Sequence, residues 1–145
     1  MKVTLLLIAS LFVLTSSFGQ LDVKEASTPE KIGEIKIAGE HSISLSYNEE
    51  PVFYTFMFKN QKYKSINDLK SFSFYSKEDL ESLYSIIEDN LGNKSKKELE
   101  IKLRNDNTLT LKFTGKQVSF LLWDGVALHY SAPYNLKQIN KLFGK

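Results

Sequence analysis

One histidine, one aspartate and two serines in the C-terminal part of the chain are of residue types that could support hydrolysis. His129 follows Asp124 by five residues, and Ser119 and Ser131 lie on either side of this pair. A histidine beside a carboxylate can act as a general base, and a serine hydroxyl that it activates can act as a nucleophile. The spacing is not specific, because Asp124 precedes Gly125 in a turn sequence and serine is frequent throughout the chain. A small hydrolase with a His129-centred site is therefore one alternative function.

Other catalytic chemistry has weaker signals. The chain contains no cysteine and only two histidines, His41 and His129, whereas catalytic zinc generally uses three protein ligands. Among the acidic pairs, Glu78-Asp79 falls in the first turn of a predicted helix, and Glu49-Glu50 precedes a proline in a turn. No phosphate-binding loop, zinc motif or nucleophile elbow is present. We expect no metal and no cofactor, and an enzyme is less favoured than a binding protein.

The first nineteen residues have the pattern of a secretory signal peptide. Lys2 precedes an uncharged apolar run at residues 3–14, and the small residues Ser17 and Gly19 come just before Gln20. The apolar run is shorter than the roughly 20 residues that a helix needs to cross a bilayer. We expect cleavage near Gly19-Gln20, a mature chain without a transmembrane segment, and a location in the periplasm or outside the cell.

The remaining chain predicts one domain of ordinary size. Residues 20–31 are polar and indicate a flexible lead-in, so the folded domain is expected at residues 32–145. Without Lys2 the chain has 18 basic against 17 acidic residues, and Arg104 is the only arginine. Proteins that bind nucleic acids favour a strong positive field and the guanidinium group, so a nucleic-acid partner is not expected.

Part of the sequence occurs twice. The segment EIKIAGEHSISLSY at residues 34–47 resembles EIKLRNDNTLTLKF at residues 100–113, at a constant offset of 66 positions. Such self-similarity indicates that one supersecondary unit is repeated. We therefore predict an internal duplication, with repeats at residues 32–93 and 98–145.

Alternation and helical spacing give the same element order in both repeats. Apolar residues alternate with polar residues in eight runs, and a helical period follows the fourth and the eighth run. The predicted strands are at residues 35–37, 41–47, 52–58, 63–75, 99–104, 108–114, 117–123 and 126–131, with a turn near Asn60-Gln61 and a break in the fourth strand at Asn67-Asp68. The predicted helices are at residues 77–92 and 136–143, and Ser76 and Asp79 have capping-box spacing at the start of the first helix. We predict an α+β fold in which four antiparallel strands and a helix occur twice, joined as one curved antiparallel sheet with both helices on one face. This layout resembles the TATA-binding-protein saddle and the two-repeat secreted beta-lactamase inhibitors, and layout alone does not transfer function.

The third strand of each repeat is apolar on both faces. Phe53 and Met57 in the first repeat, and Leu121 and Trp123 in the second, lie on the face away from the predicted helices. An uncovered apolar patch usually contacts a partner, and a tryptophan is a natural anchor for it. Alternatively, these strands are buried on both faces.

The favoured function is an exported, non-enzymatic binding module. Its predicted partner is an unknown protein or a small apolar ligand, and its predicted contact residues are Phe53, Met57, Leu121, Trp123 and His129. A third possibility is a self-associating structural domain, in which the same face or a free strand edge forms a homodimer.

Overall fold

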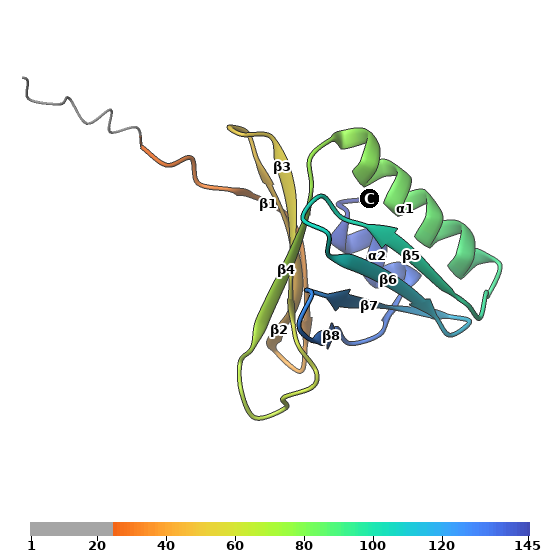
Figure 1. Cartoon of the computed structure of the whole chain (residues 1–145). Coiled ribbons are helices and arrows are strands. Elements are labelled where there is room, and N and C mark those ends of the chain that lie inside the picture. The colour runs from red at the N-terminus through yellow and green to blue at the C-terminus, as the bar shows by residue number, and fades with distance from the viewer. Residues whose placement is uncertain (1–24) are drawn as a thin grey trace, which may run out of the picture.

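The computed structural model describes residues 25–145, which form an α+β fold of two antiparallel sheets and two helices (Figure 1). Sheet A contains β1 (Glu30–Ile37), β2 (Glu40–Asn48), β3 (Phe53–Lys59) and β4 (Leu69–Phe74), in that order. Sheet B contains β5 (Glu98–Lys102), β6 (Thr108–Phe113), β7 (Gln117–Trp123) and β8 (Leu128–Tyr130), and the short strand β9 (Tyr134–Asn135) pairs with the other half of β7. The predicted signal peptide and residues 20–24 of the predicted lead-in lie outside the described residues.

The first hairpin forms where alternation predicted it. Strands β1 and β2 are joined by a two-residue turn in which Ala38 and Gly39 both have positive φ, at 53° and 81°. A turn of this kind matches the right-handed twist of the two strands that it connects. β1 begins at Glu30, five residues before the strand predicted at 35–37, because the segment 30–34 also pairs with β2. Residues 30 and 31 of the predicted flexible lead-in therefore belong to this strand. β4 is shorter than the predicted strand at 63–75, because residues 61–68 form a loop of turns and bends.

Helix α1 (Lys77–Gly92) confirms the predicted capping signal. The hydroxyl of Ser76 accepts a hydrogen bond from the backbone N–H of Asp79 at 3.1 Å, which satisfies one of the free N–H groups of the first turn. The buried side chains recur at helical spacing and consist of Leu80, Leu83, Ile87 and Leu91. The helix connects β4 of sheet A to β5 of sheet B.

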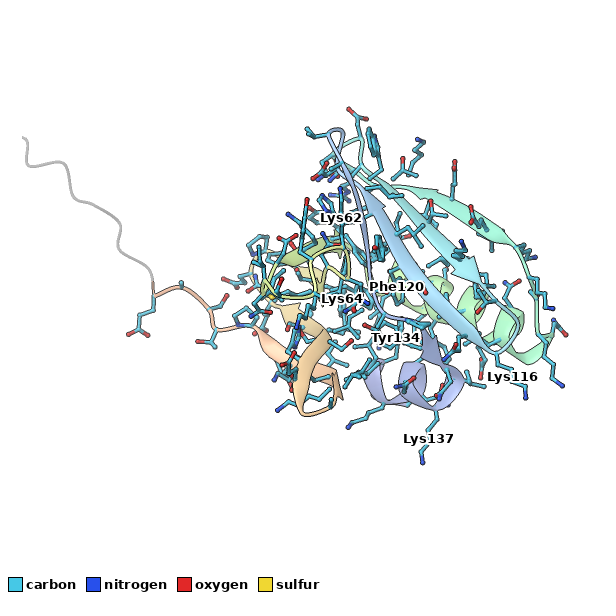
Figure 2. The ribbon with its side chains drawn as sticks, turned by 90° about the horizontal axis from the view of Figure 1, so that it is seen from below. Lys62, Lys64, Lys116, Phe120, Tyr134 and Lys137 are labelled. Carbon is cyan, nitrogen blue, oxygen red and sulfur yellow. The ribbon has the colours of Figure 1, made fainter. Side chains whose placement is uncertain are left out.

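One hydrophobic core lies between the inner faces of the two sheets. Phe56 of β3 and Phe120 of β7 approach each other across this core, with ring centroids 6.2 Å apart. Figure 2 shows Phe120 and Tyr134 in the interior, whereas Lys116 and Lys137 extend outwards. Both helices contribute to the same core, through the α1 residues above and through Ile139 and Leu142 of α2 (Leu136–Leu142).

Helix α2 packs tightly against the first strand of sheet A. A Cβ atom added to Gly33 would lie 2.3 Å from the carbonyl oxygen of Leu142 and 2.4 Å from that of Lys141. Only a residue without a side chain allows this approach of strand and helix backbones. Gly33 therefore fixes the distance between β1 and α2.

The prediction of one joined sheet is wrong, because the strands form two sheets. β4 is an edge strand of sheet A and β5 is an edge strand of sheet B, and no ladder joins them in the described part of the chain. Both helices lie on the side of sheet A that faces sheet B (Figure 1). The order of four strands followed by a helix occurs in both halves, and β9 is additional in the second half.

Candidate functional site

His129 is the centre of a buried hydrogen-bond network between the two sheets. It lies on the inner face of β8, paired with Leu122 of β7, and only 6% of the residue is exposed. Its Nε2 atom is 2.7 Å from Oδ2 of Asp124, and its Nδ1 atom is 3.1 Å from Nδ2 of Asn60. Asn60 follows β3 of sheet A and is completely buried. The network therefore joins residues 69 positions apart.

The contacts of Asn60 determine which atoms of His129 carry hydrogen. Oδ1 of Asn60 accepts from the backbone N–H groups of Lys62 and Tyr130, so its NH₂ group donates to Asp68 and to His129. Nδ1 of the imidazole is therefore an acceptor, and the ring hydrogen lies on Nε2, which donates to Asp124. A neutral imidazole satisfies every donor and acceptor of the network.

Asp124 is occupied by the loop that connects β7 to β8. Its Oδ1 atom accepts from the backbone N–H groups of Val126 and Ala127 at 2.9 and 2.8 Å, while Oδ2 accepts from His129. These donors hold the pKa of the Asp124 carboxyl well below its usual range, with the N–H of Ala127 contributing most, then His129 and the N–H of Val126. The carboxylate stabilises the loop and orients the imidazole.

Neither of the two candidate serines, Ser119 and Ser131, contacts the His129 side chain. Ser131 donates from Oγ to the carbonyl of Ala132 and accepts from the N–H of Phe120, so it faces the backbone of β7. Ser119 pairs with Lys112 on the outer face of sheet B, opposite to the face that carries His129. The geometry at His129 is that of a structural network.

The four predicted apolar contact residues do not form one patch. Phe53 and Met57 lie on the outer face of sheet A, where Met57 is 40% exposed. Leu121 and Trp123 lie on the outer face of sheet B. Because the inner faces of the two sheets enclose the core, these two outer faces point in different directions.

The residues before β1 partly cover the patch on sheet A. The hydroxyl of Ser27 donates to the side chain of Asn48 at 3.1 Å, which holds this segment at the end of β2. Pro29 then forms one wall of a small hollow of about 130 Å³ that Phe53 and Met57 also line. Phe53 is half-buried, with its ring centroid 6.4 Å from that of Tyr75.

Sheet B carries the more continuous apolar surface. In the ladder between β7 and β8, Trp123 pairs with Leu128 and Leu121 pairs with Tyr130, so all four side chains lie on the outer face. Trp123, Leu128 and Tyr130 are 43%, 44% and 40% exposed, and Leu121 is half-buried. We call these four residues the Trp123 face. Leu128 and Tyr130 were not predicted as contact residues from the sequence. Their alternation with His129 could have indicated that they lie on the other face of the strand.

The loop after β3 borders the Trp123 face. The backbone N–H of Gln61 donates to the carbonyl of Tyr130 at 2.9 Å, and the side chain of Asn60 accepts from the N–H of Tyr130. The loop thereby covers the free edge of β8, which would otherwise present unpaired backbone groups. Lys62 follows in the same loop, and its Nζ atom lies 5.6 Å from the centre of the Tyr63 ring. On the opposite side, Lys102 of β5 donates to the hydroxyl of Thr108, the residue paired with Trp123.

Residues 25–145 contain no group of three or more metal-ligating side chains. Within the same residues, no helix combines the length and apolar character that a membrane span requires. Comparison with protein-family models, with curated proteins and with solved structures finds no match.

Proposed function

We propose that the protein is an exported, non-catalytic binding module that docks a partner protein on the Trp123 face. The observation that carries this proposal is the paired arrangement of Leu121, Trp123, Leu128 and Tyr130 on one outer sheet face. An exposed surface that groups a tryptophan, a tyrosine and aliphatic side chains has the composition of an interface core.

The shape and charge of this surface favour a protein over a small ligand. The main hollows in the described residues are lined by other side chains, whereas small ligands usually occupy concave sites. Lys102 borders the face through its bond to Thr108, and its side chain forms no ion pair within residues 25–145. We infer a partner with an apolar centre and carboxylates at its rim, because such a surface complements this arrangement.

Export is proposed on the sequence of the first nineteen residues. Lys2, the apolar run and the small residues before Gln20 have the layout that a secretory signal peptidase recognises. The mass of the mature protein, isolated from the periplasm or the medium, tests this part of the proposal. Its first residue is expected to be Gln20.

We also propose that the domain arose by internal duplication. The offset of 66 residues relates Ile43 to Leu109 and Leu45 to Leu111, and all four side chains are fully buried. The same offset relates β2 to β6 and β1 to β5. The Trp123 face belongs to the second half alone, because Met57, on the corresponding strand of the first half, has polar pairing neighbours in Ser44 and Ser71.

The test compares three forms of residues 20–145. The wild type, a face variant with Trp123→Ser and Leu128→Ser, and a control with Met57→Ser are immobilised and exposed to the exported proteins of the source cell. A protein retained by wild type and control is then purified and titrated. Trp123 is the only tryptophan, so docking is expected to shift its emission to shorter wavelength.

Three results decide between the possible functions. Loss of binding in the face variant, with retention in the control, supports the proposal. Equal binding by all three forms overturns it. Sedimentation of the isolated chain tests self-association: a dimer that the face variant dissociates would show that the Trp123 face binds a second copy and not another protein.

A further inference from the structure

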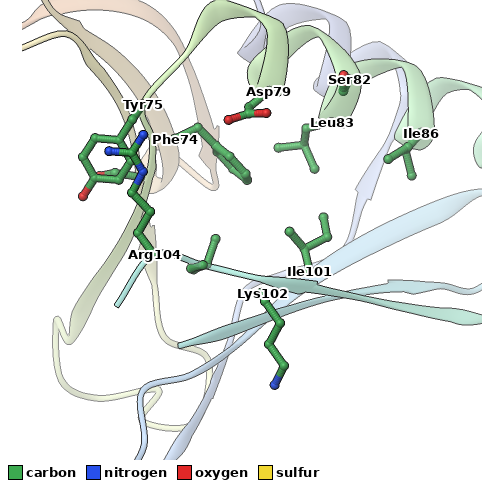
Figure 3. A pocket seen from close by; sticks show the side chains of 11 residues that line it. Phe74, Tyr75, Asp79, Ser82, Leu83, Ile86, Ile101, Lys102 and Arg104 are labelled. Carbon is green, nitrogen blue, oxygen red and sulfur yellow. The ribbon is translucent and has the colours of Figure 1, made fainter. Parts of the chain in front are cut away.

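A groove lies between the edge strands of the two sheets, away from the Trp123 face. β4 forms one wall and the end of β5 forms the other, and the first half of α1 closes the top (Figure 3). The groove contains two adjoining chambers that share Ser73, Tyr75, Leu103 and Arg104 in their walls. Chemistry differs between the two chambers.

The chamber under α1 is mainly apolar. It has a volume of about 240 Å³, and its apolar walls are Phe74, Leu83, Ile86, Ile101 and Leu103. In Figure 3, Lys102 points away from this space, whereas Asp79 lies at its helix side. The chamber has the character and approximate size for one large apolar side chain.

Arg104 is held at the boundary between the chambers. Its guanidinium carbon lies 4.3 Å from the centre of the Tyr75 ring, so the two groups stack across the gap between the sheets (Figure 3). No hydrogen bond or ion pair joins this guanidinium to an acceptor within residues 25–145. Arginine presents five donors in a planar fork that matches a carboxylate. The stacking on Tyr75 fixes the cation and leaves these donors available.

The second chamber is polar and follows the edge of β4. It has a volume of about 140 Å³, and its polar walls are Ser71, Ser73, Asn105 and Asn107. Because β4 pairs only with β3, alternate residues of β4 direct their N–H and C=O groups toward this side without a strand partner. An added extended peptide would satisfy those groups.

We propose that this groove binds the C-terminal end of an extended polypeptide. The peptide backbone adds to the free edge of β4 and runs in the direction from Ser71 to Tyr75. Its terminal carboxylate accepts from Arg104, and its last side chain, which is apolar, fills the chamber under α1. Asp79 lies at the far side of that chamber and repels a carboxylate, so the anionic end is placed at Arg104. A fatty acid would use the arginine and the apolar chamber but not the strand edge.

The test uses heptapeptides with a fixed polar sequence and a varied last residue. Peptides that end in valine, leucine, isoleucine or phenylalanine are prepared with a free carboxylate and, separately, with a C-terminal amide. Binding is measured by fluorescence anisotropy with residues 20–145, and hydrogen exchange reports on the amides of β4. We expect binding of at least one free-carboxylate peptide, about tenfold or more weaker binding of its amide, and slower exchange at Ser71 and Ser73.

Two variants separate the groove from other surfaces. Arg104→Gln is expected to weaken the free-carboxylate peptide about tenfold or more and to leave the amide unchanged. Lys116→Gln removes the same charge at a turn remote from the groove and is expected to change neither. Both positions are exposed, so each variant should fold as the wild type does, which circular dichroism checks.

Results of the same binding and exchange measurements can overturn the proposal. No binding of any free-carboxylate peptide at 1 mM, equal affinity of acid and amide, or full affinity in Arg104→Gln rejects the proposal. If decanoate displaces the peptide and binds without slowing exchange in β4, while no peptide slows it, the groove is a fatty-acid site instead. None of these outcomes depends on Trp123, so the docking proposal stands or falls separately.

Discussion

Replacement of Asn60 by alanine is the most direct test of the network that joins the two sheets. The Asn60 side chain makes four hydrogen bonds: two donated, to Asp68 and His129, and two accepted, from the backbone of Lys62 and Tyr130. All four bonds are made by one amide group, and Asn60 is completely buried. The alanine variant therefore removes all four side-chain bonds at once and leaves the backbone bond from Gln61 to Tyr130.

The magnitude follows from the groups that lose their partners. Nδ1 of His129 and the N–H of Tyr130 are left without a partner, and each such group costs about 1–3 kcal/mol when it is shielded from water. We expect the free energy of unfolding to fall by about 4 kcal/mol, a large fraction of the 5–15 kcal/mol typical of a domain. The matched control is Asn90→Ala, which removes a single bond to the carbonyl of Ile86 on α1 and should cost less than about 1 kcal/mol.

Urea unfolding followed by far-ultraviolet circular dichroism measures both variants. Asn60→Asp adds a second readout, because it places a carboxylate oxygen where the amide nitrogen now lies 2.9 Å from Asp68. That variant should be destabilised at pH 7 and should recover as the pH falls, since protonation of one carboxyl restores a donor. A loss below about 1 kcal/mol in Asn60→Ala, within the range of an ordinary surface change, would refute the reasoning.

Three further predictions concern packing and pH. Gly33→Ala should lower the free energy of unfolding by about 2–4 kcal/mol in a thermal melt, because the added Cβ meets backbone oxygens of α2, including that of Leu142. Burial raises the pKa of Tyr134 to about 12, so its folded form keeps the proton that the unfolded form loses near pH 10; stability should fall by about 2–3 kcal/mol between pH 10 and 12, and Tyr134→Phe should flatten that decline in alkaline urea titrations. The lowered pKa of Asp124 contributes stability above its unfolded pKa of about 4 that is lost as the pH falls further, so Asp124→Asn should weaken the acid dependence; unchanged acid unfolding curves would contradict this.

Features that depend on neighbouring residues could be predicted from the sequence. Alternation placed the strands of both sheets to within a few residues, apart from the first five residues of β1, the first half of the predicted strand at 63–75 and the two-residue strand β9. The helix start at Ser76 followed from one capping hydroxyl and a helical period. The pairing of β7 with β8 was predicted less accurately. Asp124-Gly125 predicted a two-residue turn, whereas Trp123 pairs with Leu128 across a four-residue loop. That difference is two residues, so every side chain kept its predicted face.

The candidate site depended more on contacts between distant segments. Tyr75 and Arg104 come from different halves of the chain and meet only because two sheet edges face each other. Asn60 was interpreted as part of a turn, and nothing in its sequence neighbourhood indicates a contact with His129. The split of the apolar residues between two outer faces has the same origin, since it follows from how sheet A and sheet B pack.

The sequence alone determined both helices, most of the strands, and which side of its strand each strand residue occupies. These properties follow from local backbone geometry, in which side chains alternate across a strand and recur every 3.6 residues along a helix. Tertiary structure decided whether the strands join into one sheet or two. It also decided that one core between those sheets buries His129 and leaves Trp123 exposed, because burial depends on the packing of segments that are remote in the chain.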